Sequence, residues 1–324
     1  MTLVYILKRL AISIPVLWLL VTLTFLFLRI VPGGPFDQDK ALPPHIKANL
    51  EKEFDLDKPV VWNTKKWSEG HYIQFFTETQ YFYAMKKLVH GDLGPSFKYR
   101  TRRVTDIILE SLPVSIELGL YAVLFAFLLG IPLGILSAHR HNTWIDHTSM
   151  FFAISGVTLP SFLIAVILIY FFSIQWGMLP AGLWDSGFEY KVLPVVALGI
   201  RPVAIIARLM RASVLDVIQA DYIRTARAKG LAEFPLMMKH VVKNSLIPVI
   251  TIAGPLVAAV ITGSFVIEHV FAIPGMAKHF IQAVTNRDYT LVMGVTIVYA
   301  VFLIVANITV DVMYSVVDPR IKLS

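Results

Sequence analysis

The sequence contains no cysteine and has few charged residues. Of its 324 residues, 16% are charged and 56% are hydrophobic, and the mean hydropathy is +0.67. Without cysteine the chain cannot form a disulfide, a thiol nucleophile or a cysteine-ligated metal site. The low charge and high hydrophobicity differ from those of a soluble domain, and we therefore expect a membrane protein.

Sequence motifs for catalysis are also missing. No glycine is followed by lysine, so the chain has no P-loop and is not itself an ATPase. Neither His-Glu-x-x-His nor Gly-x-Ser-x-Gly occurs. His139 and His141 lie close together, but beside Arg140 they are more typical of a solvated basic turn than of a metal site. The sequence predicts a non-catalytic protein without a cofactor.

Long apolar runs, in contrast, are abundant. About 20 mainly apolar residues are needed to cross the hydrocarbon core of a bilayer. Five runs reach this length clearly, and a sixth is interrupted by Arg201, Arg208 and two prolines. The six are Leu10 to Leu28, Leu118 to Ala138, Ser149 to Ile174, Val192 to Met210, Ser245 to Ile267 and Thr290 to Val310. We expect an all-α polytopic membrane protein with six transmembrane helices, the first of them an uncleaved anchor rather than a signal peptide.

The basic residues orient these spans, because lysine and arginine accumulate in short cytoplasmic segments. Six spans with both termini in the cytoplasm give the strongest asymmetry. The inside segments then hold Lys8, Arg9, Arg140, the stretch from Arg208 through Lys243, Arg320 and Lys322, whereas the short outside loops hold Lys191, Lys278 and Arg287. The net charge of +7 therefore reflects contact with lipid head groups rather than with nucleic acid.

This topology divides the chain into a few parts with different expected roles. The connection between the first two spans is long, and it lies outside. Leu42 to Phe54 has helical apolar spacing, and Trp62 to Tyr83 is rich in aromatic residues, so we expect an ordered loop. The parts are 1–31 (N-terminus and first span), 32–111 (external loop), 112–317 (core with the cytoplasmic loop 212–246) and 318–324 (cytoplasmic tail).

Few charged residues fall inside the predicted spans, where a charge usually faces protein or water. Asn307 and Asp311 are four residues apart and share a helical face, so they can line a polar passage or form a hydrogen bond between helices. Arg201 can line a pathway or pair with a carboxylate of a neighbouring helix. Glu117 and Arg208 lie near span ends, and we expect them to reach the interface.

The segment from Ala220 to Pro248 is basic and favours helix, with Gly230 and a second turn at Asn244 to Pro248 as breaks. We expect a charged helical hairpin on the cytoplasmic face, well placed to receive a mechanical push from a soluble partner. A basic amphipathic segment lying on anionic lipid is the alternative.

Seven separate blocks occur in a fixed order along the chain. They are Ile30-Val31-Pro32-Gly33-Gly34-Pro35-Phe36, His90-Gly91-Asp92-Leu93-Gly94-Pro95-Ser96-Phe97, Leu112-Pro113-Val114-Ser115, Thr225-Ala226-Arg227-Ala228-Lys229-Gly230-Leu231, Ile273-Pro274-Gly275-Met276, Arg287-Asp288-Tyr289 and Asp318-Pro319-Arg320-Ile321. This series resembles the inner-membrane permease subunits of the oligopeptide, dipeptide and nickel class of ABC importers, most closely the B-type oligopeptide permease. The chain departs from the general importer motif Glu-Ala-Ala at Arg224-Thr225-Ala226, and its stretch Trp62 to Tyr83 looks longer than the corresponding family stretch.

The resemblance implies a type I ABC importer permease in a bacterial inner membrane. Its partners would be a second, paralogous permease, two P-loop ATPase subunits and an extracytoplasmic substrate-binding protein. Oligopeptides are the implied cargo; dipeptides, nickel chelates and peptide antibiotics are alternatives, and a stand-alone secondary transporter is a different class. The implied ATPase-coupling residues are Asp221, Arg224, Thr225, Ala226, Ala228, Lys229, Gly230 and Leu231.

Overall fold

The computed structural model describes residues 2–36, 43–99, 101–185, 187–262 and 265–317. The predicted tail block at Asp318 to Ile321 lies outside these residues. In the described part the chain is helical, and its β-type pairing is one isolated bridge between Pro95 and Arg103. The chain separates into two compact units. Unit 1 comprises Met1–Ala11, Leu112–Lys278 and Val301–Ser324, and unit 2 comprises Ile12–Ser111 and His279–Ala300.

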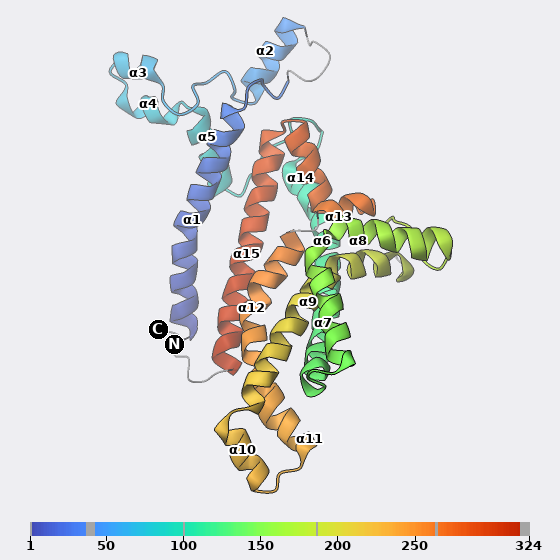
Figure 1. Cartoon of the computed structure of the whole chain (residues 1–324). Coiled ribbons are helices and arrows are strands. Elements are labelled where there is room, and N and C mark those ends of the chain that lie inside the picture. Colours follow the sequence, from blue (N-terminus) through green and yellow to red (C-terminus); the bar gives the residue numbers. More distant parts are fainter. Residues whose placement is uncertain (1, 37–42, 100, 186, 263–264, 318–324) are drawn as a thin grey trace. The chain divides into compact units, whose positions relative to one another are not determined.

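Unit 2 contains the expected external loop together with the parts of two long helices that flank it (Figure 1). As predicted, a helix follows the prolines near residue 43, and Leu50 in it is buried. The helices of unit 2 are most of α1 (Thr2–Ile30), α2 (Pro44–Glu53), α3 (Thr64–Ser68), α4 (Tyr72–Thr77), α5 (Gln80–Val89), the start of α6 (Val104–His139), most of α14 (Met276–Thr285) and the first turns of α15 (Tyr289–Val317).

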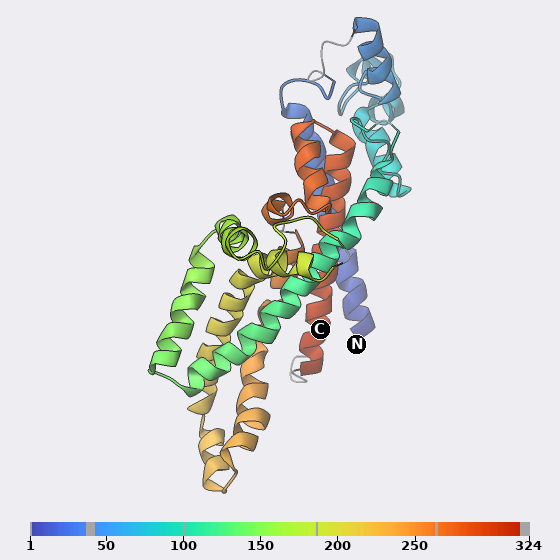
Figure 2. The ribbon, with the colours of Figure 1, turned by 90° about the vertical axis from the view of Figure 1, so that its right-hand side faces the viewer.

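Unit 1 is built around one long helix, α9, which packs against α7, α8, α12 and α13 (Figures 1 and 2). Its additional elements are α7 (Trp144–Thr158), α8 (Ser161–Leu168), the π-helix η1 (Ile169–Gln175), α9 (Glu189–Ile218), α10 (Asp221–Ala228), α11 (Glu233–Leu236), the π-helix η2 (Met237–Val242), α12 (Lys243–Thr262) and α13 (Phe265–Val270).

Five helices of the described chain are long and apolar enough to cross a membrane. The predicted spans 10–28, 118–138, 192–210 and 290–310 each lie inside one of these helices, including the doubtful fourth one. Pro194 and Pro202 are buried within α9, which remains a single helix because its apolar face is packed along its length. Together these helices confirm the polytopic all-α class.

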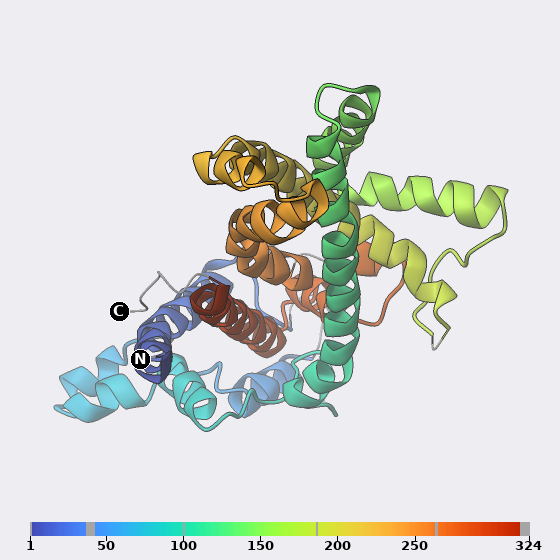
Figure 3. The ribbon, with the colours of Figure 1, turned by 90° about the horizontal axis from the view of Figure 1, so that it is seen from below.

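The predicted span from Ser149 to Ile174 is not one straight helix. The chain bends by 111° between α7 and the pair α8–η1, which together could form a sixth, broken span. Leu159 is extended and Pro160 cannot continue the hydrogen-bond pattern of α7, so the helix ends there. Seen from below, α8 and η1 project away from α12 (Figure 3).

The predicted turn at Asn244 to Pro248 also needs correction. Residues 244–248 continue α12 rather than forming a turn, since Val242 and Val249 on either side are buried in the core and hold the chain in a helix. At its other end α12 is described as far as Thr262, and the next described helix, α13, begins at Phe265.

Unit 1 depends on close contact between α6 and α9. A Cβ added at Gly134 would lie 2.6 Å from the carbonyl oxygen of Ala207, and one added at Gly199 would lie 2.6 Å from the ring of Phe125. Glycines at such crossings let two membrane helices approach closely. The intramembrane glycines of these helices therefore act in packing, and they bring buried Ile206 and Met210 into one apolar core with α12.

Candidate functional site

The predicted charged hairpin is present at the end of unit 1 where α9 stops (Figure 1). It consists of α10, a turn, α11 and η2; we call residues 221–242 the coupling hairpin. The flanking residues of the predicted loop 212–246 extend α9 and α12 instead. The hairpin thus joins two long helices of unit 1 by short connections, because only two residues separate α9 from α10 and α12 begins directly after Val242.

The turn of the coupling hairpin is fixed by Gly230. Its φ of +83° lies in the left-handed region that favours glycine. The amide of Gly230 donates to the carbonyl of Arg227 at 3.0 Å, and the amide of Leu231 donates to the carbonyl of Ala226 at 3.3 Å. This pair of bonds is the Schellman arrangement that closes a helix C-terminus. Nothing lies within 4 Å of a Cβ added at Gly230, so the requirement for glycine comes from the backbone and not from crowding in this chain.

The two sides of α10 have different surroundings. Ile223 is fully buried in the core of unit 1, and Ala226 packs against the same core. The opposite side is solvent-exposed, with the Asp221 carboxylate 99% and the Arg224 side chain 71% accessible. The pair between them is long, at 3.8 Å, so both side chains are available to a partner.

Two polar contacts hold the hairpin in shape. The Arg227 guanidinium donates to both oxygens of Glu233, at 2.7 and 3.2 Å, and so joins α10 to α11. The Asn244 amide donates to the hydroxyl of Tyr222 at 3.0 Å and joins α10 to α12. Ile223 is the apolar anchor of the hairpin in the core of unit 1.

Seven of the eight predicted coupling residues lie together on the exposed side of the hairpin; the eighth, Ala226, faces the core. Sequence reasoning missed Phe234, whose large apolar side chain is 77% exposed at the start of α11. The sequence did contain a signal for this exposed residue, namely an aromatic residue followed by Pro235 within a basic loop. The exposed side therefore offers charges of both signs and one apolar contact.

The structure does not bring the predicted pathway residues together in one site. Arg201 is exposed on α9, and among the described residues it has no ion-pair partner. Asp311 on α15 pairs instead with Arg9 on α1 at 3.1 Å, within unit 1, and Asn307 is half-buried on the same helix. Asp311 thus joins two helices, which was one of its two predicted roles.

Glu117 forms an ion pair with Lys191 at the start of α9, a residue that the sequence placed in a short outside loop. The Lys191 ammonium also lies 5.3 Å from the ring centre of Trp184. No group of three or more His, Cys, Asp or Glu residues in the described chain could hold a metal ion.

Two of the seven sequence blocks meet at a carboxylate in unit 1 that sequence reasoning missed. Glu268 is fully buried, and it accepts from the hydroxyl of Ser115 at 2.8 Å and from the amide of Ala277 at 3.0 Å. The Ser115 hydroxyl in turn accepts from the amide of Met276 at 2.8 Å. A carboxylate near the first amides of α14 is favourable, because they have no partner within the helix. The blocks around residues 112–115 and 273–276 therefore form one structural joint.

A second buried carboxylate joins two blocks within unit 2. Asp288 accepts from the amide of Leu291 at 3.1 Å and so caps α15. Its other oxygen accepts from the hydroxyl of Ser96 and from the amide of Lys98, the latter at 3.3 Å. The block that ends at Phe97 is thereby fixed to the start of α15. Both joints are structural, since their polar atoms are occupied within the chain.

Comparison with known proteins is consistent with this architecture. Residues 130–323 match the family described as binding-protein-dependent transport system inner membrane component. The dipeptide transport system permease protein DppB of Bacillus subtilis is 40% identical, with 98% of each chain covered. The oligopeptide transport system permease proteins OppB of Haemophilus influenzae and Escherichia coli are 41% and 40% identical, each over 98% of this chain and 99% of theirs.

Solved structures resemble the fold at much lower identity. A chain of the inward-facing MetNI methionine ABC transporter has a TM-score of 0.54 and 17% identity, covering 66% of this chain and 97% of its own. An amino acid ABC transporter crystallised with histidines has a TM-score of 0.50 and 18% identity, covering 65% of this chain and 94% of its own. About two thirds of this chain thus superposes on nearly the whole length of each of those transporter chains.

Proposed function

Because the chain belongs to the family of binding-protein-dependent transport system inner membrane components, we propose that it forms half of the passage through which an ATP-driven importer takes up oligopeptides. The observation that carries the proposal is the similarity over 98% of the chain to permeases named for oligopeptide and dipeptide transport. The chain is a non-catalytic ABC transporter subunit of the inner membrane, and a separate subunit hydrolyses ATP. Dipeptides are the nearest alternative cargo.

The coupling hairpin is the proposed contact with one of two ATPase subunits. Its exposed side carries Asp221, Arg224 and Phe234, and its buried side is anchored by Ile223. A groove on the ATPase that takes up this side would hold a rigid body, since the Arg227–Glu233 pair fixes α10 to α11. Movement of the ATPase would then rotate α9 and α12 with the hairpin and change access to the passage.

A second, paralogous permease supplies the other half of the passage in this proposal. The need for a partner is supported by α7 and α8, which expose large apolar side chains such as Phe151, Phe152 and Phe162. Lipid or a neighbouring helix can cover such surfaces. The hairpin lies on the cytoplasmic side with both termini, and an extracytoplasmic binding protein delivers the peptide to the opposite side, as the distribution of basic residues predicts.

Uptake of a labelled oligopeptide into proteoliposomes tests the proposal. The vesicles contain this chain, the paralogous permease, both ATPases and the binding protein, and each component is omitted in turn. We expect uptake to require ATP and every component. Uptake that persists without the ATPases would instead establish a secondary transporter, and an assembled complex that hydrolyses ATP but ignores oligopeptides would overturn the cargo. Dipeptides, nickel chelates and peptide antibiotics serve as competing substrates.

A charge reversal at Arg224 tests the coupling role separately. We expect Arg224→Glu to reduce peptide-stimulated ATP hydrolysis and uptake at least about tenfold, the effect of losing roughly 1.4 kcal/mol of docking free energy. Arg140→Glu is the matched control, because Arg140 is also exposed but lies in the loop between α6 and α7. Equal effects of the two reversals on assembly and uptake would refute the assignment of the hairpin.

A further inference from the structure

Residues 59–79, which precede α5, form a compact excursion with a closed base; we call it the aromatic hairpin. The carbonyl of Pro59 accepts from the amide of Gln80, and the carbonyl of Val60 accepts from the amide of Tyr81, both at 3.0 Å. Inside the excursion, the amide of Asn63 donates to the carbonyl of Phe75 at 3.0 Å. The excursion is therefore folded on itself and attached to α5 at a defined point.

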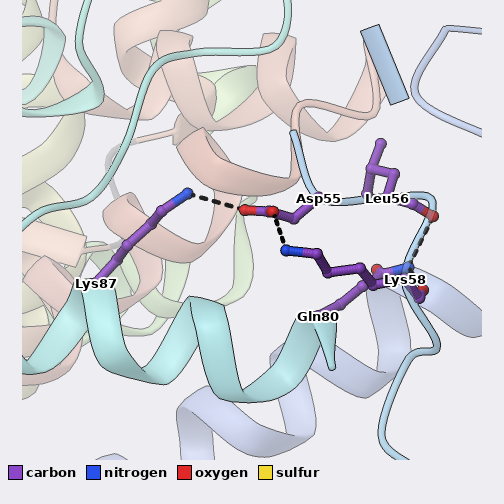
Figure 4. A network of polar contacts seen from close by, with 5 residues as sticks. All are labelled: Asp55, Leu56, Lys58, Gln80 and Lys87. Carbon is purple, nitrogen blue, oxygen red and sulfur yellow. Dashed lines mark hydrogen bonds and ion pairs between the residues drawn. The ribbon is translucent and has the colours of Figure 1, made fainter. Parts of the chain in front are cut away.

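Its base is fixed further by a polar network (Figure 4). The Gln80 side-chain amide donates to the carbonyls of Leu56 and Lys58, at 3.0 and 2.7 Å. The Lys58 ammonium donates to Asp55 at 2.6 Å, and Lys87 on α5 pairs with the other oxygen of Asp55 at 3.4 Å. The chain that enters the aromatic hairpin is thus held against the helix that leaves it.

The surface of the aromatic hairpin is unusually apolar for an external loop. Trp67 lies at its centre, with ring centres 4.9 Å from Tyr72 and 5.1 Å from Phe75, and Phe75 contacts Phe76 at 4.6 Å. Although these rings touch, Trp67 is 54%, Phe76 56% and Ile73 78% exposed. Contiguous exposed apolar side chains of this kind mark a binding surface.

The position of the aromatic hairpin relative to the membrane surface follows from its attachment to α1 within unit 2. Gln80, directly after the hairpin, accepts a hydrogen bond from the Arg29 guanidinium at 2.9 Å. Tyr81 bonds Thr22 at 2.8 Å and contacts the ring of Phe25 at 5.3 Å. Phe25 is five residues before the end of α1, about 7.5 Å along the helix at 1.5 Å per residue. The base of the hairpin therefore lies at the level of the last two turns of the apolar span, where hydrocarbon gives way to head groups.

We propose that the aromatic hairpin inserts its exposed apolar side chains into the head-group region of the leaflet at the C-terminal end of α1. Tryptophan and tyrosine prefer this depth because their rings are apolar and their N–H or O–H groups are polar. Lys65 is exposed on α3 of the same hairpin and can reach lipid phosphates while its stem remains in the interface, whereas the Lys66 ammonium pairs with Glu69 at 2.9 Å. In the proposed orientation this is the outer leaflet, and the insertion holds the external loop against the membrane surface.

The absence of cysteine makes a direct test possible, since every single-cysteine variant carries one labelling site. The full chain, with nitroxide labels at Ile73→Cys or Phe76→Cys, is reconstituted in nanodiscs of phosphatidylethanolamine and phosphatidylglycerol. Collisional relaxation by oxygen, which concentrates in lipid, is compared with relaxation by a water-soluble nickel chelate. Lys52→Cys on α2 is the matched control, because Lys52 is exposed but lies outside the hairpin.

We expect labels at 73 and 76 to be several-fold more accessible to oxygen than to nickel, and the control to show the reverse. Nickel accessibility equal to that of the control would mean that the surface faces water. Protection from both reagents, whether in the chain alone or only after addition of the binding protein, would mean that protein covers it. Either result overturns the proposal. The measurement involves no transport, so it is independent of the proposed cargo.

The cysteine variants themselves are expected to fold, because the replaced side chains point outward. Circular dichroism and size-exclusion chromatography check this. A double variant, Ile73→Ser with Phe76→Ser, removes the apolar side chains and should leave the fold intact. The label is then placed at Trp62→Cys, which is also exposed within the hairpin. We expect the accessibility of this label to the nickel chelate to increase in the double variant. No change at that site would show that residues 73 and 76 do not hold the hairpin in the lipid.

Discussion

Replacing Asp146 with alanine is expected to destabilise unit 1 by about 3 kcal/mol. The Asp146 side chain is 1% exposed and accepts from Nε and Nη2 of Arg211, at 2.6 and 2.7 Å. It also accepts from the hydroxyl of Ser137 and from the amide of Asn142, the latter at 3.0 Å. Asp146 thus joins the loop between α6 and α7 to α9.

The magnitude follows from what the substitution leaves behind. Removing one partner of a buried ion pair typically costs about 3–5 kcal/mol, because the other charge stays buried without compensation. The Arg211 side chain is 23% exposed and can recover part of its hydration, so the lower end of that range applies. Arg211→Met should cost at least as much, because it leaves the Asp146 carboxylate buried without its counter-charge, with only Ser137 and Asn142 donating to it.

A double-mutant cycle provides the assay. The wild-type chain, Asp146→Ala, Arg211→Met and the double variant are unfolded by sodium dodecyl sulfate in mixed micelles, and helix loss is followed by circular dichroism. We expect the double variant to cost at least 1 kcal/mol less than the sum of the single variants, roughly the coupling expected of residues in contact. Additive effects, or a loss below about 1 kcal/mol for Asp146→Ala, would refute the reasoning.

Three further outcomes follow from the same structure. Gly275→Ala should lower the free energy of unfolding by about 1–3 kcal/mol in the same assay, because a Cβ would overlap the buried carboxylate of Glu268; unchanged stability would contradict the joint. Gly230→Ala should cost about 1 kcal/mol through its positive φ alone, and Gly230→Asn less, which thermal unfolding can distinguish. Partial burial raises the pKa of Asp55, but hydrogen bonds and charges from Lys58 and Lys87 outweigh it and hold that pKa below its ordinary value. The ionised Asp55 therefore stabilises the fold above its ordinary pKa of about 4, and this stability is lost as the pH falls through the lowered pKa of the folded state. Asp55→Asn should lower the thermal midpoint of unfolding at neutral pH and leave it unchanged at low pH.

Sequence periodicity and charge were sufficient to find the long helices and the coupling hairpin. The run around Val192 to Met210 forms one helix despite its prolines and arginines, and Gly230 ends α10 as its position predicts. Apolar length is set by bilayer thickness, and a helix stop at glycine is set by local backbone sterics. Neither depends on which other segment lies nearby.

The bend at Pro160 was not predicted, although the proline itself is a visible signal. Proline is common in membrane helices and often leaves them continuous, as Pro202 and Pro248 do here. Whether the chain bends depends on the packing on either side of the proline. That packing involves residues distant in sequence, such as Ile200 against Gly156.

The sequence by itself determined the class of this protein, the number of long apolar segments, the basic hairpin and, through its ordered blocks, the family. Only the tertiary structure decided what those blocks do. Ser115 meets Glu268 across 153 positions of sequence, and Ser96 meets Asp288 across 192. The physical reason is that a buried carboxylate is stable only where several donors converge on it, and such convergence is a property of the folded chain.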